Sequence, residues 1–378
     1  MGRKQDTRYA TSQALTSTAN HSQLPTGLSR TLRKIKRSIN RSKAFEHKMR
    51  SVQALFLTLA TFRWNGVDAF APVARPIARS TSLRMVDEAT SSDVYVVVNG
   101  MPGPIATAAA EACLRKGLNL SPFAMTGPDM EPSTITVVDK VSGRNSNVRL
   151  IPSSDQNEII RSLAGIRETA GAENVMAIDY THPSAVNGNA VFYAANNLPF
   201  VMGTTGGDRD KLMEDVRGHF CVIAPNMGKQ IVAMQSALED LATKYPGAFE
   251  GYKLKVTESH QKTKADTSGT AKAVIASIQK LAADDSFSND DIEMLRDDQS
   301  SIDFGVPADA LNGHAYHTYT LTSPDGSVNF QLQHNVAGRT IYAEGTADAV
   351  KFLARQVKAG ESPKQYSMID VLEAGALA

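Results

Sequence analysis

The feature that most constrains the fold is a regular alternation of short apolar runs and helical segments that starts near residue 93. The first run, VYVVVNG, is rich in β-branched residues and ends at Gly100, which is typical of a buried parallel strand. An Ala-rich segment with a helical pattern follows and stops at Gly117. This succession of an apolar run and a helical segment recurs up to residue 226. The sequence therefore predicts an α/β fold with a doubly wound parallel sheet and right-handed crossovers.

The pattern changes after residue 226. A long helical segment is followed by the apolar run GYKLKVTESH, and later two strand-like runs are joined by Pro-Asp-Gly, a strong turn signal. We therefore expect a second, α+β domain at 227–339 that includes an antiparallel hairpin. A last helical pattern after residue 340 is expected to return to the first domain, which would comprise 91–226 with 340–378.

Residues 1–90 have the composition of a targeting segment. The first fifty residues are basic and almost free of acids, and the run SVQALFLTLATF after them is too short to span a membrane. The AFAP sequence at 69–72 resembles the bipartite presequences of algae whose plastids have extra membranes. That resemblance implies delivery to the plastid stroma, with Met1 or Met49 as the start; a disordered basic tail is the alternative.

Composition excludes several classes of protein. The net charge of +1 over 378 residues gives no basic field of the kind that nucleic-acid binding requires. Two cysteines, Cys113 and Cys221, are too few for a disulfide framework and are expected to be buried thiols.

His314 and His317 lie three apart in a strand pattern, so they should face opposite sides of a sheet and not share a metal. His334 is expected to be a packed or hydrogen-bonded histidine, and no metal is predicted.

The turn after the first strand has the spacing of a dinucleotide site. Gly100 and Gly103 permit a tight turn with close backbone approach, and Ala106 takes the third small position. The motif predicts a Rossmann-type domain, although an ordinary strand–helix turn is the alternative for the motif alone. The second strand ends without the acid that binds the ribose of NAD, which favours NADPH. Thr181 follows a later strand and is expected near the nicotinamide ribose.

The segment ESHQKTKADTSGTAKA carries the chemistry. Residues 268–270 stand at the start of a helical pattern that runs to about Ala282, where free amides and the helix dipole favour an anion. Lys264 adds a full positive charge, and His260 is expected to titrate near neutral pH and transfer a proton. The alternative is a surface helix capped by Asp266 or Thr267, with solvated lysines.

His-x-x-x-Lys followed by Ser-Gly-Thr-Ala, after a domain with GTTG and APN loops, resembles the dihydrodipicolinate reductase family. The His-Gln pair at 260–261 is similar to the plant-type branch, and the resemblance covers roughly residues 94–357. It implies NAD(P)H-dependent reduction of 4-hydroxy-tetrahydrodipicolinate to tetrahydrodipicolinate in the diaminopimelate route to lysine. It also implies that the second domain binds the small dicarboxylate substrate and joins subunits into a homodimer or homotetramer.

The resemblance assigns roles to individual positions. It implies that His260 donates or accepts a proton and that Lys264 is the proton donor. The positions implied for binding the dicarboxylate are Gln261, Ser268, Gly269, Thr270 and Arg339. Those implied for the cofactor are Gly100, Gly103, Gly203, Thr204, Thr205, Ala224, Pro225, Asn226 and Met227. Pro104 stands where the family usually has a basic residue, so NADPH is expected but NADH stays possible.

Two other functions are compatible with such a chain. Another NADPH-linked dehydrogenase of amino-acid metabolism is one, but aspartate-semialdehyde dehydrogenase needs a catalytic cysteine at a helix N-terminus. Cys113 lies within a helical pattern and Cys221 within a strand pattern, which disfavours it. A protein that binds NADPH without turnover is the other, and the pair of His260 and Lys264 argues against it.

Overall fold

The computed structural model describes residues 93–375, so the targeting segment expected at 1–90 lies outside the described residues. The strands are β1 (Tyr95–Asn99), β2 (Asn119–Leu120), β3 (Phe123–Thr126), β4 (Ser133–Val138), β5 (Asn145–Pro152), β6 (Val175–Asp179), β7 (Phe200–Met202), β8 (Cys221–Ile223), β9 (Lys253–His260), β10 (Glu293–Leu295), β11 (His314–Thr322), β12 (Asn329–Ala337) and β13 (Gln365–Tyr366). The α-helices are α2 (Pro104–Arg115), α3 (Gln156–Ala170), α4 (Val186–Ala195), α5 (Arg209–Asp215), α6 (Lys229–Lys244), α7 (Gly269–Ala282), α8 (Asp298–Asp303), α9 (Thr340–Lys358) and α10 (Met368–Glu373). Short 3₁₀ turns occur at Ala172–Asn174, Pro183–Ala185, Asn289–Asp291 and Ala308–Ala310.

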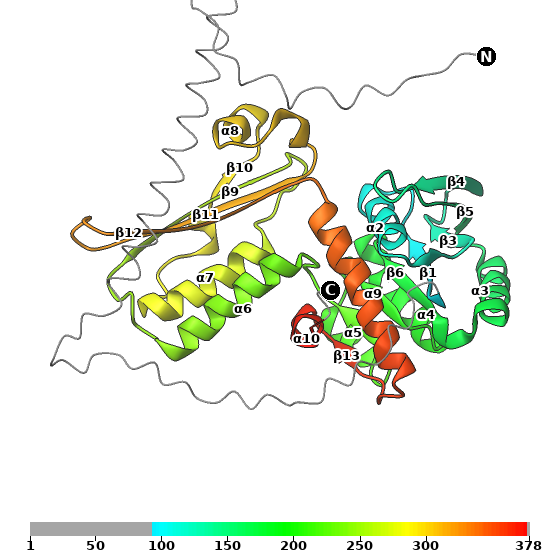
Figure 1. Ribbon diagram of the computed structural model, residues 1–378. Coiled ribbons are helices and arrows are strands. Elements are labelled where there is room, and N and C mark those ends of the chain that lie inside the picture. Colours follow the sequence, from blue (N-terminus) through cyan, green and yellow to red (C-terminus); the bar gives the residue numbers. More distant parts are fainter. Residues whose placement is uncertain (1–92, 376–378) are drawn as a thin grey trace, which may run out of the picture. The chain divides into compact units, whose positions relative to one another are not determined.

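A six-stranded parallel sheet in the order β13-β8-β7-β6-β1-β2 forms the first part of the fold. Successive residues of β1 serve opposite faces because side chains alternate along a strand. Val96 and Val98 belong to one core with α2 and α9, whereas Val97 belongs to the core with α3 and α4. Helices therefore cover both faces of the sheet (Figure 1), and the predicted doubly wound arrangement is confirmed.

The predicted second strand is wrong in one respect. The run from residue 119 to 126 reads as one strand, but it is two: β2 pairs with β1, and β3 joins β5 and β4 in a separate three-stranded sheet. Pro122 lies at the break, where its missing N–H cannot continue the pairing. The ends of β1 and β3 stay adjacent, because Gly100 N donates to Met125 O at 3.0 Å.

The second part is a four-stranded sheet in the order β10-β9-β11-β12. The predicted hairpin is β11 and β12, which pair antiparallel over their full length. Helices α6 and α7 lie side by side against this sheet (Figure 1), and Ile275 and Ile278 pack on Val256 and Tyr319. In the register of β9 with β11, His317 lies directly opposite Glu258.

Helix α9 connects the end of β12 to the parallel sheet, where it packs against α2, β6, β7 and β8. A Cβ at Gly345 would lie 1.7 Å from Met227 O, so the helix backbone rests directly on the loop after β8. Asp348 is buried and forms ion pairs with Lys116 at 2.6 Å and with Lys229. These contacts hold the first turn of α6 against α9.

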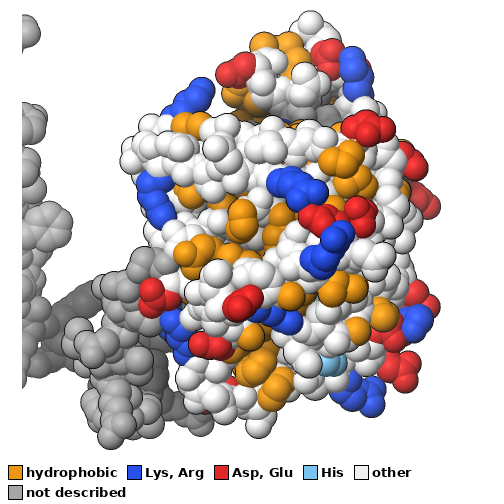
Figure 2. Space-filling model, turned by 90° about the vertical axis from the view of Figure 1, so that its right-hand side faces the viewer, with side chains coloured by type: hydrophobic (Ala, Val, Ile, Leu, Met, Phe, Trp, Pro, Cys, Tyr) orange, Lys and Arg blue, Asp and Glu red, His pale blue; other side chains and the backbone are white. Residues whose placement is uncertain are grey.

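The surface carries charges of both signs. On the face shown in Figure 2, acidic and basic side chains are interspersed and separated by neutral and apolar groups. Between residues 93 and 375, no helix is both long enough and apolar enough to cross a membrane.

Candidate active site

The turn between β1 and α2 needs glycine for a steric reason. Gly100 has φ +99°, and a Cβ there would lie 2.1 Å from Tyr180 O at the end of β6. The first helical hydrogen bond of α2 runs from Thr107 N to Gly103 O, and no side chain caps the helix. The amide of Ile105 precedes that bond, so this N-terminus leaves donors for an anion such as a pyrophosphate.

The buried carboxylate of Asp179, the last residue of β6, holds two neighbouring loops. Its Oδ1 accepts hydrogen bonds from Thr181 Oγ1 at 2.8 Å and from Thr204 Oγ1 at 2.7 Å. Its Oδ2 accepts from Tyr193 Oη at 2.7 Å and from Asn189 Nδ2 at 2.9 Å. Two residues predicted for the cofactor, Thr181 and Thr204, therefore share one carboxylate that the sequence analysis did not single out.

The other predicted cofactor positions lie at the same edge of the sheet, after β7 and β8. A Cβ at Gly203 would lie 2.4 Å from the ring of Tyr180, so this loop also packs tightly. Thr205 and Pro225 are exposed, whereas Ala224 and Met227 are buried.

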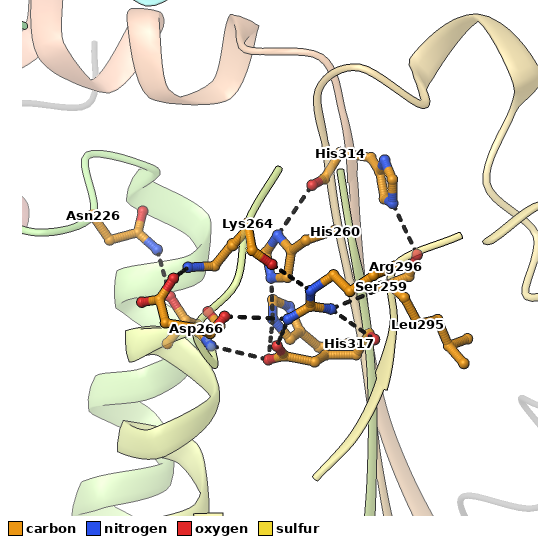
Figure 3. Close-up of polar contacts among 12 residues, drawn as sticks. Asn226, Ser259, His260, Lys264, Asp266, Leu295, Arg296, His314 and His317 are labelled. Carbon is orange, nitrogen blue, oxygen red and sulfur yellow. Dashed lines mark hydrogen bonds and ion pairs between the residues drawn. The ribbon is translucent and has the colours of Figure 1, made fainter. Parts of the chain in front are cut away.

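Asn226 joins the two halves of the candidate site. Its Nδ2 donates to Thr270 Oγ1 at 3.0 Å, and its Oδ1 accepts from Gly228 N at 2.8 Å. The loop after β8 is thereby tied to the N-terminus of α7, as Figure 3 shows for the Asn226 side chain.

Helix α7 begins at Gly269 and ends at Ala282, as predicted. Its first intrahelical bond runs from Lys272 N to Ser268 O, so the amides of Gly269 and Thr270 have no partner within the helix. At Gly269 a Cβ would meet no protein atom within 4 Å. The N-terminus of α7 therefore opens onto free space and can receive a carboxylate.

Lys264 lies in the loop that leads into α7. Its Nζ is 2.6 Å from Asp266 Oδ1, and its backbone N donates to Gln261 O at 2.9 Å. Arg296, which the sequence analysis missed, fixes this loop by donating to Lys264 O at 2.8 Å and to Asp266 O at 3.2 Å (Figure 3). The loop thus has a fixed backbone and a cationic side chain on it.

His260 is the last residue of β9 and is largely buried. Its Nδ1 lies 3.1 Å from His314 O and its Nε2 lies 3.2 Å from His317 Nε2 (Figure 3). Burial, followed by the electrostatic effect of the neighbouring His317 ring, lowers the pKa of His260 from 6.5 to about 3. The expectation that this ring titrates near neutral pH is therefore wrong for the chain without ligand, in which His260 is neutral.

Glu258, two residues earlier on β9, is fully buried beneath His260. Burial alone would raise its pKa, but the adjacent His317 ring and hydrogen bonds from Arg296 and Ser268 N favour the charged form and lower the pKa to about 2. Arg296 is 2.5 Å away and Ser268 N donates at 3.1 Å. Glu258, His260 and His317 bring ligand-type atoms within 4.8 Å of one another.

The remaining predicted residues lie elsewhere. His314 contacts Ser259 Oγ at 2.8 Å, on the face of the sheet opposite His317, so the prediction that these two histidines face apart is confirmed. Arg339 donates to Asn312 O at 3.0 Å, in the loop before β11. This contact of Arg339 is not with the loop that carries Lys264, and its substrate role stays a prediction.

Both cysteines are inert thiols. Cys113 in α2 and Cys221 in β8 have no exposed surface, and burial raises the pKa of each thiol to about 12. Neither can supply the thiolate that a cysteine-dependent dehydrogenase uses.

A parallel sheet with a glycine turn after its strand β1 is tied through Asn226 to the N-terminus of α7, which the loop of Lys264 precedes. This combination is typical of a dinucleotide-binding protein that has a separate region for an acidic small molecule. Two family models match the chain: "Dihydrodipicolinate reductase, N-terminus" over residues 94–227 and "Dihydrodipicolinate reductase, C-terminus" over residues 230–372.

Relatives with curated names agree with these models. The chain is 44% identical over 283 residues to "Probable 4-hydroxy-tetrahydrodipicolinate reductase 1, chloroplastic" of Oryza sativa subsp. japonica, which covers 74% of this chain and 79% of that protein. It is 42% identical over 285 residues to "4-hydroxy-tetrahydrodipicolinate reductase 1, chloroplastic" of Arabidopsis thaliana, covering 75% and 78%. The chain belongs to the dihydrodipicolinate reductase family.

Among solved structures, a dipicolinate-bound dihydrodipicolinate reductase from Paenisporosarcina sp. TG-14 is similar with a TM-score of 0.45 and 18% identity, over 72% of this chain and 97% of the other. The family assignment rests on the sequence relatives and not on this likeness.

Proposed function

We propose that the chain reduces 4-hydroxy-tetrahydrodipicolinate to tetrahydrodipicolinate with NAD(P)H, in the diaminopimelate route to lysine. Family membership and the names of the plant relatives support the reaction. The observation that carries it here is the hydrogen bond from Asn226 to Thr270, which joins a cofactor-side loop to the anion site at α7. A nicotinamide and a dicarboxylate can meet at such a junction.

The substrate is a small cyclic dicarboxylate. One carboxylate fits the N-terminus of α7, where the amides of Gly269 and Thr270 and the helix dipole favour negative charge. Lys264 lies in the loop that precedes this N-terminus and adds a formal charge. We assign Gln261, Ser268 and Arg339 to the substrate pocket on the family resemblance, as positions to be tested.

The reduction needs a proton as well as a hydride. The substrate loses water, gains one hydride at a ring carbon conjugated to the C=N bond and takes up one proton, so one NAD(P)H and one H⁺ give NAD(P)⁺ and water. Bound NAD(P)H supplies the hydride. Lys264 is the proposed donor of the proton to the side of the ring where negative charge develops, once a substrate carboxylate draws its Nζ away from Asp266.

His260 has a different task in the proposal. The neutral ring accepts at one nitrogen and donates at the other, with Nδ1 turned to His314 O and Nε2 turned to the His317 ring. A dicarboxylate beside it brings negative charge that raises the pKa of His260 from about 3, so binding favours its protonation. The ring then adds positive charge and a second proton source when substrate is present.

The cofactor site fits a dinucleotide. The α2 N-terminus lacks a side-chain cap, and Asp179 fixes the two threonines of the neighbouring loops. Strand β3 ends at Thr126, whose hydroxyl donates to Met101 O at 2.8 Å, and this residue offers no acid to a ribose. We propose NADPH as the preferred cofactor. NADH should also be accepted, because Pro104 stands where the family usually has a basic residue and adds no positive charge for a phosphate of the cofactor.

Two further proposals follow the relatives. The plant relatives are named chloroplastic, and residues 1–90 have the composition of a bipartite presequence, so we propose the plastid stroma as the compartment. We also propose a homodimer or homotetramer joined through the second sheet.

The test is an assay of the chain from about residue 86 onward with freshly made synthase product, formed from pyruvate and aspartate semialdehyde. Rapid oxidation of NADPH that is lost in Lys264→Ala is the expected result, and the rate ratio of NADPH to NADH reports the cofactor preference. A folded protein that binds NADPH but oxidises neither cofactor would instead be a non-catalytic NADPH-binding protein.

A further inference from the structure

Three buried side chains on neighbouring strands direct ligand atoms at one point. Glu258 and His260 lie two apart on β9 and share a face of the sheet, and His317 on β11 lies opposite Glu258 in the strand register. His260 Nε2, His317 Nε2 and a carboxylate oxygen of Glu258 all lie within 4.8 Å of one another. Figure 3 shows the rings of His260 and His317 turned toward each other.

The spacing suits a tetrahedral metal ion. The two Nε2 atoms are 3.2 Å apart, and His317 Nε2 is 3.7 Å from Glu258 Oε2. Zinc bonds of roughly 2.0–2.2 Å in a tetrahedron separate neighbouring ligand atoms by about 3.3–3.5 Å. Two of the three pairs are therefore within a few tenths of an ångström of that geometry, and the third pair, Glu258 and His260, lies within 4.8 Å and must close by up to about 1.3 Å. Two histidines and one glutamate form a known zinc ligand set that leaves the fourth position open.

The hydrogen bonds around the cluster also favour metal binding. With its Nδ1 proton donated to His314 O, neutral His260 carries a lone pair at Nε2, and such an outer hydrogen bond also orients a metal-bound imidazole. His317 Nδ1 has no hydrogen-bond partner in the described part of the chain. Moving the proton of His317 from Nε2 to Nδ1 therefore breaks only the contacts that a metal would replace.

The charges nearby limit the strength of binding. Arg296 lies against Glu258 Oε1 and opposes a second cation, whereas Lys264 is neutralised by Asp266. Glu258 Oε2 accepts from Ser268 N at 3.1 Å and keeps a second lone pair for a metal. We therefore expect the metal ion to bind more weakly than in a site with no neighbouring cation such as Arg296, but to bind only at this cluster.

We propose that Glu258, His260 and His317 form a binding site for a borderline divalent transition-metal ion, of which Zn²⁺ is the representative. Occupancy removes the Nε2 lone pair of His260, so the bound ion blocks any proton transfer through that ring. This inhibitory consequence rests on the proposed function, whereas the binding itself does not. The ion is therefore a reversible inhibitor and not a cofactor of the reaction.

Binding is measured directly on the tag-free chain after treatment with a chelator. Calorimetric titration with Zn²⁺ should give one ion per chain, and Co²⁺ should give the intense visible absorption of a tetrahedral site. His317→Gln should weaken Zn²⁺ binding by at least about 100-fold, beyond the roughly 10–100-fold that loss of an outer hydrogen bond costs. His314→Gln is the matched control, because its side chain lies on the other face of β11 and its backbone carbonyl is kept.

Three results would overturn the proposal: no binding by the wild-type chain, equal binding by His317→Gln, or a weak octahedral Co²⁺ spectrum. The Co²⁺ spectrum is taken on the wild-type chain, so it decides even if a variant fails to fold. If the chain binds Zn²⁺ but does not oxidise NADPH with the proposed substrate, the metal site stands and the proposed function fails. If the chain is active and Zn²⁺ does not bind, the reverse holds.

Discussion

The side chain of Asn226 donates a 3.0 Å hydrogen bond to the hydroxyl of Thr270, and this contact joins the loop after β8 to the first turn of α7. The same side chain accepts from Gly228 N, so its orientation is fixed from its own loop. Because one residue ties the loop proposed for the cofactor to the N-terminus proposed for the substrate carboxylate, we expect small displacements at this contact to affect the reaction more than the fold.

Asn226→Ala should therefore lower kcat/KM about tenfold or more, because a lost hydrogen bond of roughly 1–1.5 kcal/mol would misplace both loops. Steady-state kinetics with NADPH and substrate measure the effect, and thermal unfolding should change little. Asn196→Ala is the control, since the hydrogen bond described for that side chain is to Phe192 O in α4. Equal losses in the two variants would contradict a positioning role for Asn226.

Lys264→Ala should reduce kcat by about 100-fold or more, in the range that general acid catalysis contributes. Lys262→Ala in the same loop is the matched control, because Lys262 is 65% exposed and pairs with Asp298 instead. The measurement is single-turnover oxidation of NADPH with saturating substrate. If both lysine variants retain wild-type turnover, Lys264 is not the proton donor.

Gly269→Ala should raise the KM for the dicarboxylate about tenfold, or about 1.4 kcal/mol, without loss of stability. The added methyl group meets no protein atom within 4 Å, so it occupies space at the amides of α7 that a carboxylate needs. Gly165→Ala in α3 also meets no neighbouring atom and serves as the control. Unchanged KM in Gly269→Ala would show that no ligand group lies there.

Tyr193→Phe should weaken NADPH binding several-fold, because it removes a 2.7 Å donor to the carboxylate of Asp179, which positions Thr181 and Thr204. Tyr193 is fully buried in the core beneath the sheet and should act only through Asp179. Fluorescence titration of NADPH measures the affinity. Tyr366→Phe is the control: it removes a hydroxyl that lies 3.4 Å from Gln356 in α9, and this variant should bind NADPH normally.

Acid should destabilise the fold in a window set by His260. The folded-state pKa of His260 is lowered from 6.5 to about 3, so the unfolded chain binds this proton more readily. Stability is therefore fully present above pH 6.5 and is lost as the pH falls toward 3, by roughly 1–2 kcal/mol at pH 5. The lowered pKa of Glu258, about 2, adds a loss that begins only below its usual value of 4.5.

Urea unfolding at pH 7 and pH 5 measures this dependence. The difference in unfolding free energy between the two pH values should shrink in His260→Gln, which has no imidazole to protonate. An unchanged difference would mean that His260 is not held neutral in the fold.

The parts of the fold that follow from local signals were predictable. The alternation of apolar runs with helical segments predicted the parallel sheet, and the Ser-Gly-Thr cap predicted the start of α7 at Gly269. The break between β2 and β3 was not predicted, since the composition of the run suits a continuous strand and only Pro122 marked the gap.

Only some of the candidate site residues could be predicted, for a related reason. His260 and Lys264 lie four residues apart and share one motif, but their partners come from other strands. Arg296 reaches Glu258 across 38 residues, and His317 reaches His260 across 57. Only the alternation of β9, which puts Glu258 and His260 on one face, could have indicated that Glu258 belongs to the site. The low pKa of His260 depends on burial by these distant elements and could not be read from its motif.

Helix α9 shows how a residue remote from any ligand can restrict the chemistry. Gly345 is a poor helix former, at a cost of about 1 kcal/mol relative to alanine, yet no larger residue leaves room for Met227 O. Met227 is the neighbour of Asn226, whose side chain reaches Thr270. A methyl group added at position 345 would push against Met227 O and so displace Asn226 and its contact with Thr270. The size of this one helix residue therefore limits how the candidate site can be arranged.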